Sequence, residues 1–330
     1  MSNDGSRGSV APADEEPGPA AGPRRHLRTV VGVVFLVVVV ALAVVAVLRD
    51  RVKFAAALAE IGWGAVALSG LLAAGAVAAS YAVWAQVLRS LSAEMPRRAS
   101  VPVFFISQLG KYLPGSVWPV LAQMEAGRAH RIPRRSMVAA NLLTLLVLLA
   151  VAVAVACALL PLGSTEALHR FWWLFLALPV LLVLAHPRVL PAVLDRAFRL
   201  VRQPPLDTPL RMGPLVGALG WSLLSWVLFG GHLAVLCAGL GYTGISVLVL
   251  CTGAMALAVT VGILFIPAPA GAGLREGALL LALSPLLVEE QGLVVALTSR
   301  VELVVVDLAL AGLGAAFGAA VRLSRTAPVR

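Results

Sequence analysis

An apolar segment at residues 101–122 is long enough to cross a membrane, yet Pro114-Gly115 and Pro119 interrupt it. Proline removes a backbone hydrogen-bond donor and clashes with the preceding turn, and glycine loses more entropy than other residues in a helix. A single straight helix is therefore not expected here. Broken backbone survives at membrane depth only where it is buried in protein or lines a cavity. Because transporters place their binding sites at such breaks, the segment is a candidate site.

Basic residues lie on both sides of this segment. Three arginines precede it and four follow it, namely Arg89, Arg97, Arg98, Arg128, Arg131, Arg134 and Arg135. Loops rich in arginine and lysine lie on the cytoplasmic side of a membrane. We therefore predict that residues 101–122 enter and leave on the same side, as a re-entrant hairpin.

The composition excludes an ordinary soluble domain. Hydrophobic residues make up 60% of the chain and charged residues 13%, and the mean hydropathy is +0.94. Soluble domains are only about half apolar. The net charge of +10 could suggest nucleic acid, but the arginines lie in short loops and tails, where they act as topology signals and contact anionic headgroups. Cys157, Cys237 and Cys251 lack metal-ligand spacing and are predicted to be small buried hydrophobes.

The chain is predicted to be an all-α polytopic membrane protein. Residues 1–23 are a disordered tail, residues 24–325 the transmembrane domain and residues 326–330 a cytoplasmic tail. A spanning helix needs about 20 apolar residues, which gives about seven full spans. These spans lie at residues 29–48, 63–88, 137–160, 171–185, 214–240, 245–265 and 291–321. Residues 49–60 are expected to form a short interfacial helix. Both termini are placed in the cytoplasm, and the membrane is expected to be the cell membrane.

A second break follows residue 265. Pro267 and Pro269 begin a Pro/Gly-rich stretch that ends at Gly273, and the apolar piece at residues 277–288 is too short to span alone. We therefore predict a second discontinuous element at residues 267–288. Its topology remains open, although Glu289-Glu290 are expected to lie outside.

Charged residues are rare in the apolar segments, where they are costly and tend to face a cavity or each other. Lys111 precedes the first break, Arg275 and Glu276 follow the second, and Arg300 lies in the last helix. The cations could together meet a phosphate or carboxylate headgroup. The alternative is internal pairing, of Arg300 with Glu302 or Asp307 and of Arg275 with Glu276 or with another helix. The predicted substrate-binding residues are Gln108, Lys111, Tyr112, Pro114, Gly115, Arg275, Glu276 and Arg300.

The remaining polar residues are assigned structural roles. Gln123, Glu125 and Arg128 are expected on a solvated cytoplasmic rim, His232 is expected to pack inside a helix bundle, and Asn141 and Thr144 are expected to bond between helices. No Gly-rich phosphate loop, close histidine pair or Gly-x-Ser-x-Gly motif is present. We therefore predict no catalytic residues, no cofactor and no metal.

Two motifs resemble those of a known family, the lysylphosphatidylglycerol synthase transmembrane-region (flippase-like) membrane proteins. The first is Gly110-Lys111-Tyr112-Leu113-Pro114-Gly115, and the second runs from Pro267 to Glu276 and is similar to the family's Pro-Gly-Gly-x-Gly-x-x-Glu pattern. Arg300 early in the last helix fits as well, but Ala270 and Ala272 stand where glycines are usual. The resemblance covers about residues 28–325.

The resemblance implies a domain that moves aminoacylated phospholipid or polyprenyl-phosphate-linked cargo between leaflets. Full-length synthases carry a soluble aminoacyl-transfer domain after this region, and this chain ends soon after its last helix, so that enzymatic activity is not expected. The leading hypothesis is a lipid flippase-like transporter for an anionic lipid. The alternatives are a membrane-embedded lipid-modifying enzyme and a non-catalytic subunit of a lipid or glycan synthase, with a synthase or glycosyltransferase as partner.

Overall fold

The computed structural model describes residues 59–112, 118–128, 130–176, 179, 196, 210–264 and 273–326, except the side chains of residues 174 and 321–326. The chain divides into two units, Met1–Leu42 and Ala43–Arg330, and all described residues belong to the second. The predicted tail at residues 1–23, the first span at 29–48 and most of the interfacial helix lie outside the described residues. So do most of the predicted span at 171–185 and both Pro/Gly breaks.

Five helices in the described part of the chain are long and apolar enough to cross a membrane. They are α3 (Trp63–Ser90), α6 (Arg134–Leu159), α10 (Met212–Gly239), α11 (Ile245–Leu264) and α13 (Glu289–Thr326). All five were predicted as spans, and the described residues contain no strand. The protein is therefore an all-α polytopic membrane protein.

Shorter helices occupy the segments between these spans. They are α4 (Arg97–Gln108), the 3-10 helix η1 (Leu109–Tyr112), α5 (Trp118–Arg128), α7 (Thr165–Phe171), the 3-10 helix η2 (Trp172–Leu176) and α12 (Leu274–Leu283). At a rise of about 1.5 Å per residue, α4, α5 and α12 each reach less than about 20 Å, against a hydrocarbon core of about 30 Å. None of the three can span the membrane alone, as predicted for the two broken elements.

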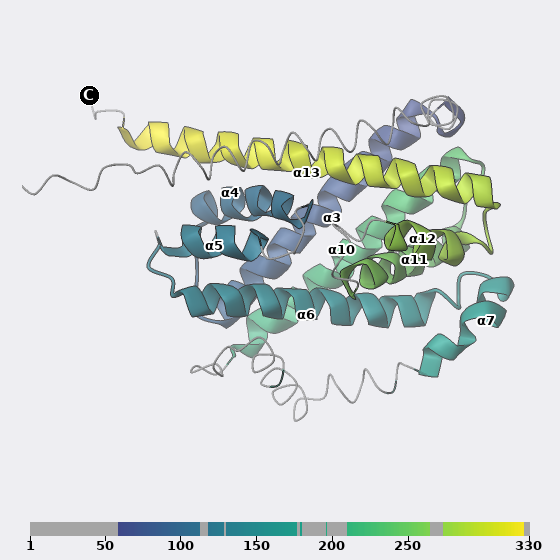
Figure 1. Cartoon of the computed structure of the whole chain (residues 1–330), viewed down its shortest axis with the longest axis horizontal. Helices are drawn as coiled ribbons and strands as arrows, with labels where there is room; N and C mark the ends of the chain where they lie inside the picture. Colours follow the sequence, from purple (N-terminus) through teal and green to yellow (C-terminus); the bar gives the residue numbers. More distant parts are fainter. Residues whose placement is uncertain are drawn as a thin grey trace, which may run out of the picture. The chain divides into compact units, whose positions relative to one another are not determined.

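The α4–α5 pair lies between two long helices. In Figure 1, α13, α4, α5 and α6 follow one another in a stack, and neighbouring members of the stack are in contact. A hydrogen bond of 2.8 Å from Gln123 Nε2 to Ser107 Oγ joins α5 to α4, and Asn141 of α6 donates to Gln123 Oε1 at 2.8 Å. The two helices that flank the interruption are therefore bonded to each other and, through α5, to a long helix.

Close packing between α3, α10 and α11 forms the other half of this unit. Ser225 of α10 donates to the Ala76 carbonyl of α3 at 2.9 Å and contacts Ser80 Oγ at 3.0 Å. Helices α10 and α11 are joined by a turn at residues 241–244, where Gly241 and Gly244 have φ of 90° and 117°. Small residues and interhelical hydrogen bonds are the usual means of association between membrane helices.

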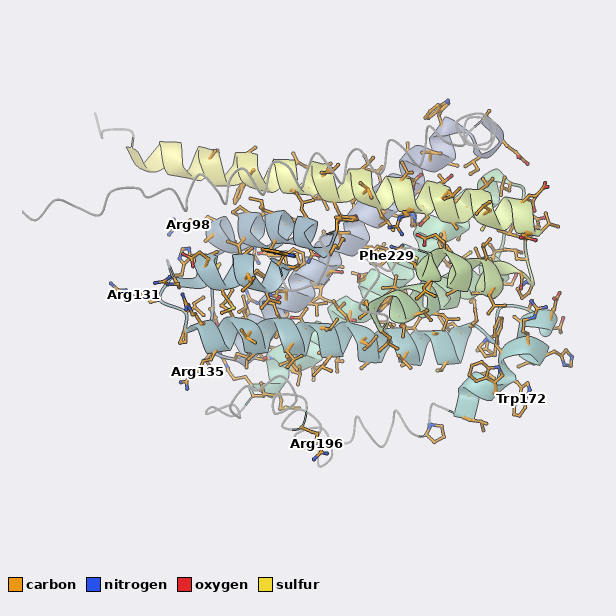
Figure 2. All side chains as sticks on the ribbon, in the orientation of Figure 1. Arg98, Arg131, Arg135, Trp172, Arg196 and Phe229 are labelled. Atoms are coloured by element: carbon orange, nitrogen blue, oxygen red, sulfur yellow. The ribbon has the colours of Figure 1, made fainter. Side chains whose placement is uncertain are left out.

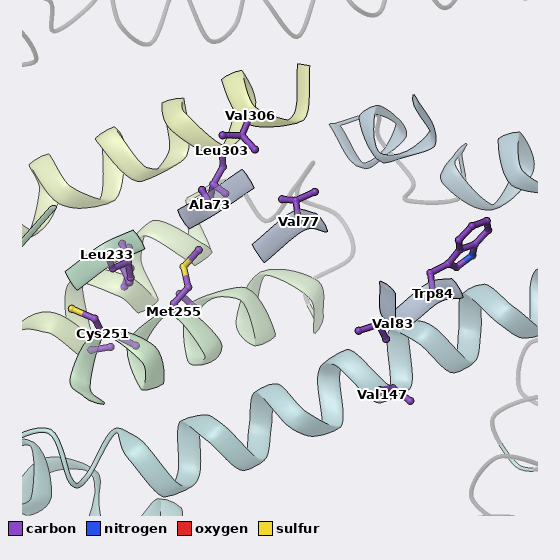
Figure 3. Packing of buried hydrophobic residues seen from close by; sticks show 14 of the residues in the cluster. Ala73, Val77, Val83, Trp84, Val147, Leu233, Cys251, Met255, Leu303 and Val306 are labelled. Atoms are coloured by element: carbon purple, nitrogen blue, oxygen red, sulfur yellow. The ribbon is translucent and has the colours of Figure 1, made fainter. Parts of the chain in front are cut away.

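The buried apolar core joins these helices. Figure 3 shows Ala73 and Val77 of α3, Leu233 of α10, Met255 of α11 and Leu303 of α13 within one cluster. Cys157, Cys237 and Cys251 are buried and free, as predicted, although Cys237 Sγ and Cys251 Sγ lie 3.7 Å apart.

Several predicted boundaries were wrong by two or three residues, and two of them have a clear physical reason. The last helix begins at Glu289 instead of residue 291, because acidic residues in a first turn interact favourably with the helix dipole. The short helix of the second break begins at Leu274 instead of residue 277, because Gly273 at φ 85° is its N-cap and the Gly273 N–H donates to Glu276 Oε2 at 2.7 Å.

Several of the basic loop residues lie at one end of the stack. Figure 2 shows Arg98, Arg131 and Arg135 near the ends of α4, α5 and α6, while Trp172 lies near the opposite end of α6. This distribution agrees with the predicted basic face.

We predict that Gly230→Ala destabilises the protein by about 1–3 kcal/mol through overpacking. A Cβ at this position of α10 would lie 1.9 Å from Thr252 Oγ1 and 2.5 Å from Thr252 Cα of α11. Denaturant titration of the purified protein in detergent measures the change. The matched control is Gly220→Ala on the same helix, where a Cβ meets nothing within 4 Å. Equal stability of the two variants would contradict the close α10–α11 contact.

Candidate functional site

Ionisable side chains from three elements gather where the two breaks meet the last helix. Lys111 and Tyr112 end η1, directly before the undescribed residues 113–117, and Arg275 and Glu276 open α12, directly after residues 265–272. Helix α13 contacts both η1 and α12, and supplies Arg300 and also Asp307, which was not among the predicted substrate-binding residues. We call these six residues the charged cluster.

Asp307 forms one half of the cluster. Its side chain is 1% exposed, and Oδ2 lies 2.7 Å from Lys111 Nζ. The Tyr112 hydroxyl donates to the same oxygen at 2.5 Å. Asp307 Oδ1 is buried and has no hydrogen-bond partner among the described residues. Lys111, in contrast, is 40% exposed on its side chain. Asp307 therefore holds Lys111 and Tyr112 against α13, and keeps the ammonium group at an accessible position.

Glu276 forms the other half. Its Oε1 accepts a hydrogen bond from Arg300 Nη1, while Oε2 accepts from the N–H of Gly273 at 2.7 Å. One carboxylate therefore fixes the start of α12 and joins it to α13. The side chains are partly accessible, at 29% for Arg300 and 15% for Glu276.

Arg275 is close enough to both halves to interact electrostatically with Tyr112, Asp307, Glu276 and Arg300. It forms no ion pair with any described residue, and its one hydrogen bond is a contact of 3.6 Å from Nη2 to Met255 Sδ. Three cations thus face two carboxylates, so the described part of the cluster has one surplus positive charge.

Five of the eight predicted substrate-binding residues meet in this cluster, namely Lys111, Tyr112, Arg275, Glu276 and Arg300. Gln108 lies at the end of α4, directly before η1, and forms no hydrogen bond with a described residue. Pro114 and Gly115 lie outside the described residues. Gly110 of η1 lies where η1 and α5 approach each other closely. A Cβ at this position would lie 2.9 Å from Pro119 N of α5, so a larger residue would not fit without a shift.

The alternative of internal pairing was wrong in its partners. Arg300 pairs with Glu276 instead of Glu302 or Asp307, and Arg275 does not pair with Glu276. Residues one or two apart on a helix do not face each other, and residues seven apart lie two turns apart. The geometry therefore disfavours an ion pair within one helix here. Arg300 of α13 pairs instead with Glu276 of α12.

The other polar predictions had mixed outcomes. Gln123 is buried between α4 and α6, so its placement on a solvated rim was wrong, whereas Glu125 and Arg128 form an exposed pair at 3.5 Å. Asn141 bonds between helices as predicted. Thr144 Oγ1 is buried with no partner in the described structure, so its predicted bond was wrong.

Sequence reasoning named Asp307 only as a possible partner of Arg300. The spacing of Asp307 from Arg300 could have indicated that it belongs to the site, since a residue seven positions after Arg300 lies on the same helix face. The described residues contain no group of three or more His, Cys, Asp or Glu arranged for a metal ion. The cations of the cluster are an ammonium and two guanidinium groups, which are the side-chain groups that bind carboxylates and phosphates in proteins.

Comparison with known proteins gives one match. The family model described as the lysylphosphatidylglycerol synthase TM region matches residues 30–311. No curated protein and no solved structure matches the sequence. The match spans both breaks and every member of the charged cluster.

We predict a coupling free energy of about 0.5–3 kcal/mol between Lys111 and Asp307. Lys111→Met and Asp307→Asn each remove the ion pair, so the double variant should lose less stability than the sum of the single variants. Denaturant titration in detergent provides the double-mutant cycle.

The control cycle combines Glu125→Gln with Arg128→Met. This exposed pair on α5 should couple by less than about 0.5 kcal/mol, because water screens it. Additive losses at Lys111 and Asp307 would contradict the pairing seen in the structure.

Proposed function

Because this chain belongs to the lysylphosphatidylglycerol synthase TM region family, we propose that it moves an anionic lipid headgroup between the two leaflets. The family and the five apolar helices make it a multi-pass membrane protein with a lipid-related function. Translocation itself is the proposal, and the charged cluster is its proposed binding site.

The surplus positive charge of the cluster carries this proposal. Isolated charges in hydrocarbon are costly, so a cluster that served only to neutralise itself would balance cations with carboxylates. Here Arg275 has no carboxylate partner among the described residues, and Lys111 is the most exposed member of its pair. A phosphate could accept hydrogen bonds from both groups, since a guanidinium offers a planar fork and an ammonium a compact charge.

The location of the cluster suits a lipid substrate. A headgroup crossing the hydrocarbon core without a polar path carries a large desolvation penalty. The cluster provides charged partners at two interrupted segments, and the acyl chains can stay in the lipid beside the apolar faces of the spans. The protein then replaces the hydration of the phosphate with fixed charges during the crossing.

The cargo class follows from the chemistry and the family. We propose an aminoacylated phospholipid or a polyprenyl-phosphate-linked lipid, because both carry the phosphate that the cations would bind. We also propose the cell membrane as the location, both termini in the cytoplasm, and a lipid or glycan synthase or a glycosyltransferase as a partner.

No observation favours a lipid-modifying enzyme over a transporter. Acid–base chemistry needs a carboxylate positioned beside the reacting group. Glu276 is engaged by Arg300 and by the Gly273 N–H, and Glu125 is exposed beside Arg128. We therefore propose that the chain binds and moves its lipid without changing it chemically.

We predict that Lys111→Ala, Arg275→Gln and Arg300→Gln each slow lipid exchange by about 10- to 100-fold, as expected for the loss of one hydrogen bond to a charged group. The assay uses the full chain in liposomes that contain fluorescently tagged phosphatidylglycerol. The fraction of label that a membrane-impermeant quencher reaches is followed with time.

The control is Arg128→Ala, which removes an exposed cation from α5 outside the cluster and should leave the rate unchanged. Tagged polyprenyl phosphate in the same assay distinguishes the two cargo classes. Exchange that equals protein-free liposomes for both lipids would refute the transport proposal, and unchanged rates in all three cluster variants would refute the site.

A further inference from the structure

A second polar network lies inside the bundle, apart from the charged cluster. His232 of α10 is fully buried between α3 and α13. Its Nδ1 lies 2.7 Å from Ser69 Oγ, 3.1 Å from the Ser69 carbonyl oxygen and 3.2 Å from Glu302 Oε2. Its Nε2 lies 2.9 Å from Ser299 Oγ. Nothing in the proposed headgroup site uses these residues.

The hydrogen bonds determine where protons lie in this network. Ser69 Oγ donates to Glu302 Oε2 at 2.5 Å, so its one proton is committed. The Ser69 carbonyl accepts only. All neighbours of His232 Nδ1 are therefore acceptors, which requires a proton on Nδ1. The remaining site of proton exchange on the imidazole is Nε2, which faces Ser299.

Ser299 accommodates both protonation states of the imidazole. Its hydroxyl can donate to a neutral Nε2, or accept from a protonated one after rotating about its C–O bond. Glu302 provides the balancing group, since its side chain is 9% exposed and Oε1 has no partner among the described residues. A buried pair with one exchangeable proton is neutral overall, either as imidazolium and carboxylate or as imidazole and carboxylic acid. Losing this proton leaves one buried negative charge.

The surrounding helices place no other described ionisable group in contact with this pair. On α13, Arg300 pairs with Glu276 of α12, and Asp307 is engaged by Lys111 and Tyr112. Arg275 contacts Met255 of α11. Cys237 of α10 and Cys251 of α11 contact each other, and Tyr81 of α3 is hydrogen-bonded to Ser100. Arg89 lies 20 residues from Ser69 along α3, which is about 30 Å.

Helix α13 connects the network to the charged cluster. Glu302 lies two residues after Arg300, which is about 3 Å along the axis and roughly opposite in direction. Its contacts agree, since Glu302 meets α3 and α10 while Arg300 and Asp307 meet α12 and η1. A change of charge at Glu302 therefore acts on the same rigid helix that holds two members of the headgroup site.

We propose that His232 and Glu302 form a proton-binding site, with Ser69 and Ser299 as hydrogen-bond partners, that couples lipid movement to the transmembrane proton gradient. The proposed proton binding is argued from the hydrogen-bond network alone. The proposed coupling rests in addition on the proposed lipid transport. A proton taken up from one side neutralises the buried carboxylate before the helices rearrange, and leaves toward the other side afterwards.

Proton binding is tested without transport. Infrared difference spectra of the full chain in nanodiscs, recorded as the pH changes, should contain either a carbonyl band of a protonated carboxylic acid that disappears in Glu302→Gln or an imidazolium band that disappears in His232→Gln. Spectra with neither band, or with a titrating band that persists in the matching variant, overturn the proton site.

Coupling is tested with tagged phosphatidylglycerol in liposomes with equal or different pH on the two sides. If one proton moves with each lipid, a difference of one pH unit shifts the leaflet ratio by up to about tenfold. Glu302→Gln should retain exchange at equal pH and lose this shift. Exchange that ignores the pH difference overturns the coupling but leaves the proposed transport intact. A shift produced by a sodium gradient at equal pH overturns the assignment to protons.

Discussion

The cost of a charge in a low-dielectric interior governs the arrangement of this protein. Every described ionisable group on the inner part of α13 has a partner on another helix: Arg300 on α12, Asp307 on η1 and Glu302 on α3 and α10. Isolated charges would be expensive there, and paired ones fix which helices meet. The last helix therefore acts as the element against which the two interrupted segments and the α3–α10 pair are aligned.

The helices beside the first interruption show how buried side-chain polarity is satisfied under the same constraint. Helix α4 stops at Gln108 and tightens into η1, and α5 packs beside α4. Gly110 permits the close approach to Pro119, and Gln123 supplies a buried amide that bonds to Ser107 of α4 and to Asn141 of α6. Hydrogen bonds between helices thus satisfy these polar side chains.

Much of the fold and part of the site could be predicted from the sequence. Long apolar runs identified α3, α6, α10, α11 and α13, and the rarity of charge in them identified Lys111, Arg275, Glu276 and Arg300. Their partners could not be predicted, because pairing joins helices far apart in sequence: Lys111 to Asp307 spans nearly 200 residues. His232 was expected only to pack, since no local pattern links it to Glu302, 70 residues away.

The length of α13 makes its orientation depend on the thickness of the bilayer. Its 38 residues extend about 57 Å, nearly twice the hydrocarbon thickness, so a membrane can accommodate it only by inclination or by protrusion of its ends. A thicker bilayer favours a more upright helix, and a thinner one a more slanted helix. The depths of Arg300 and Asp307, about 10 Å apart along the axis, then change together with bilayer thickness.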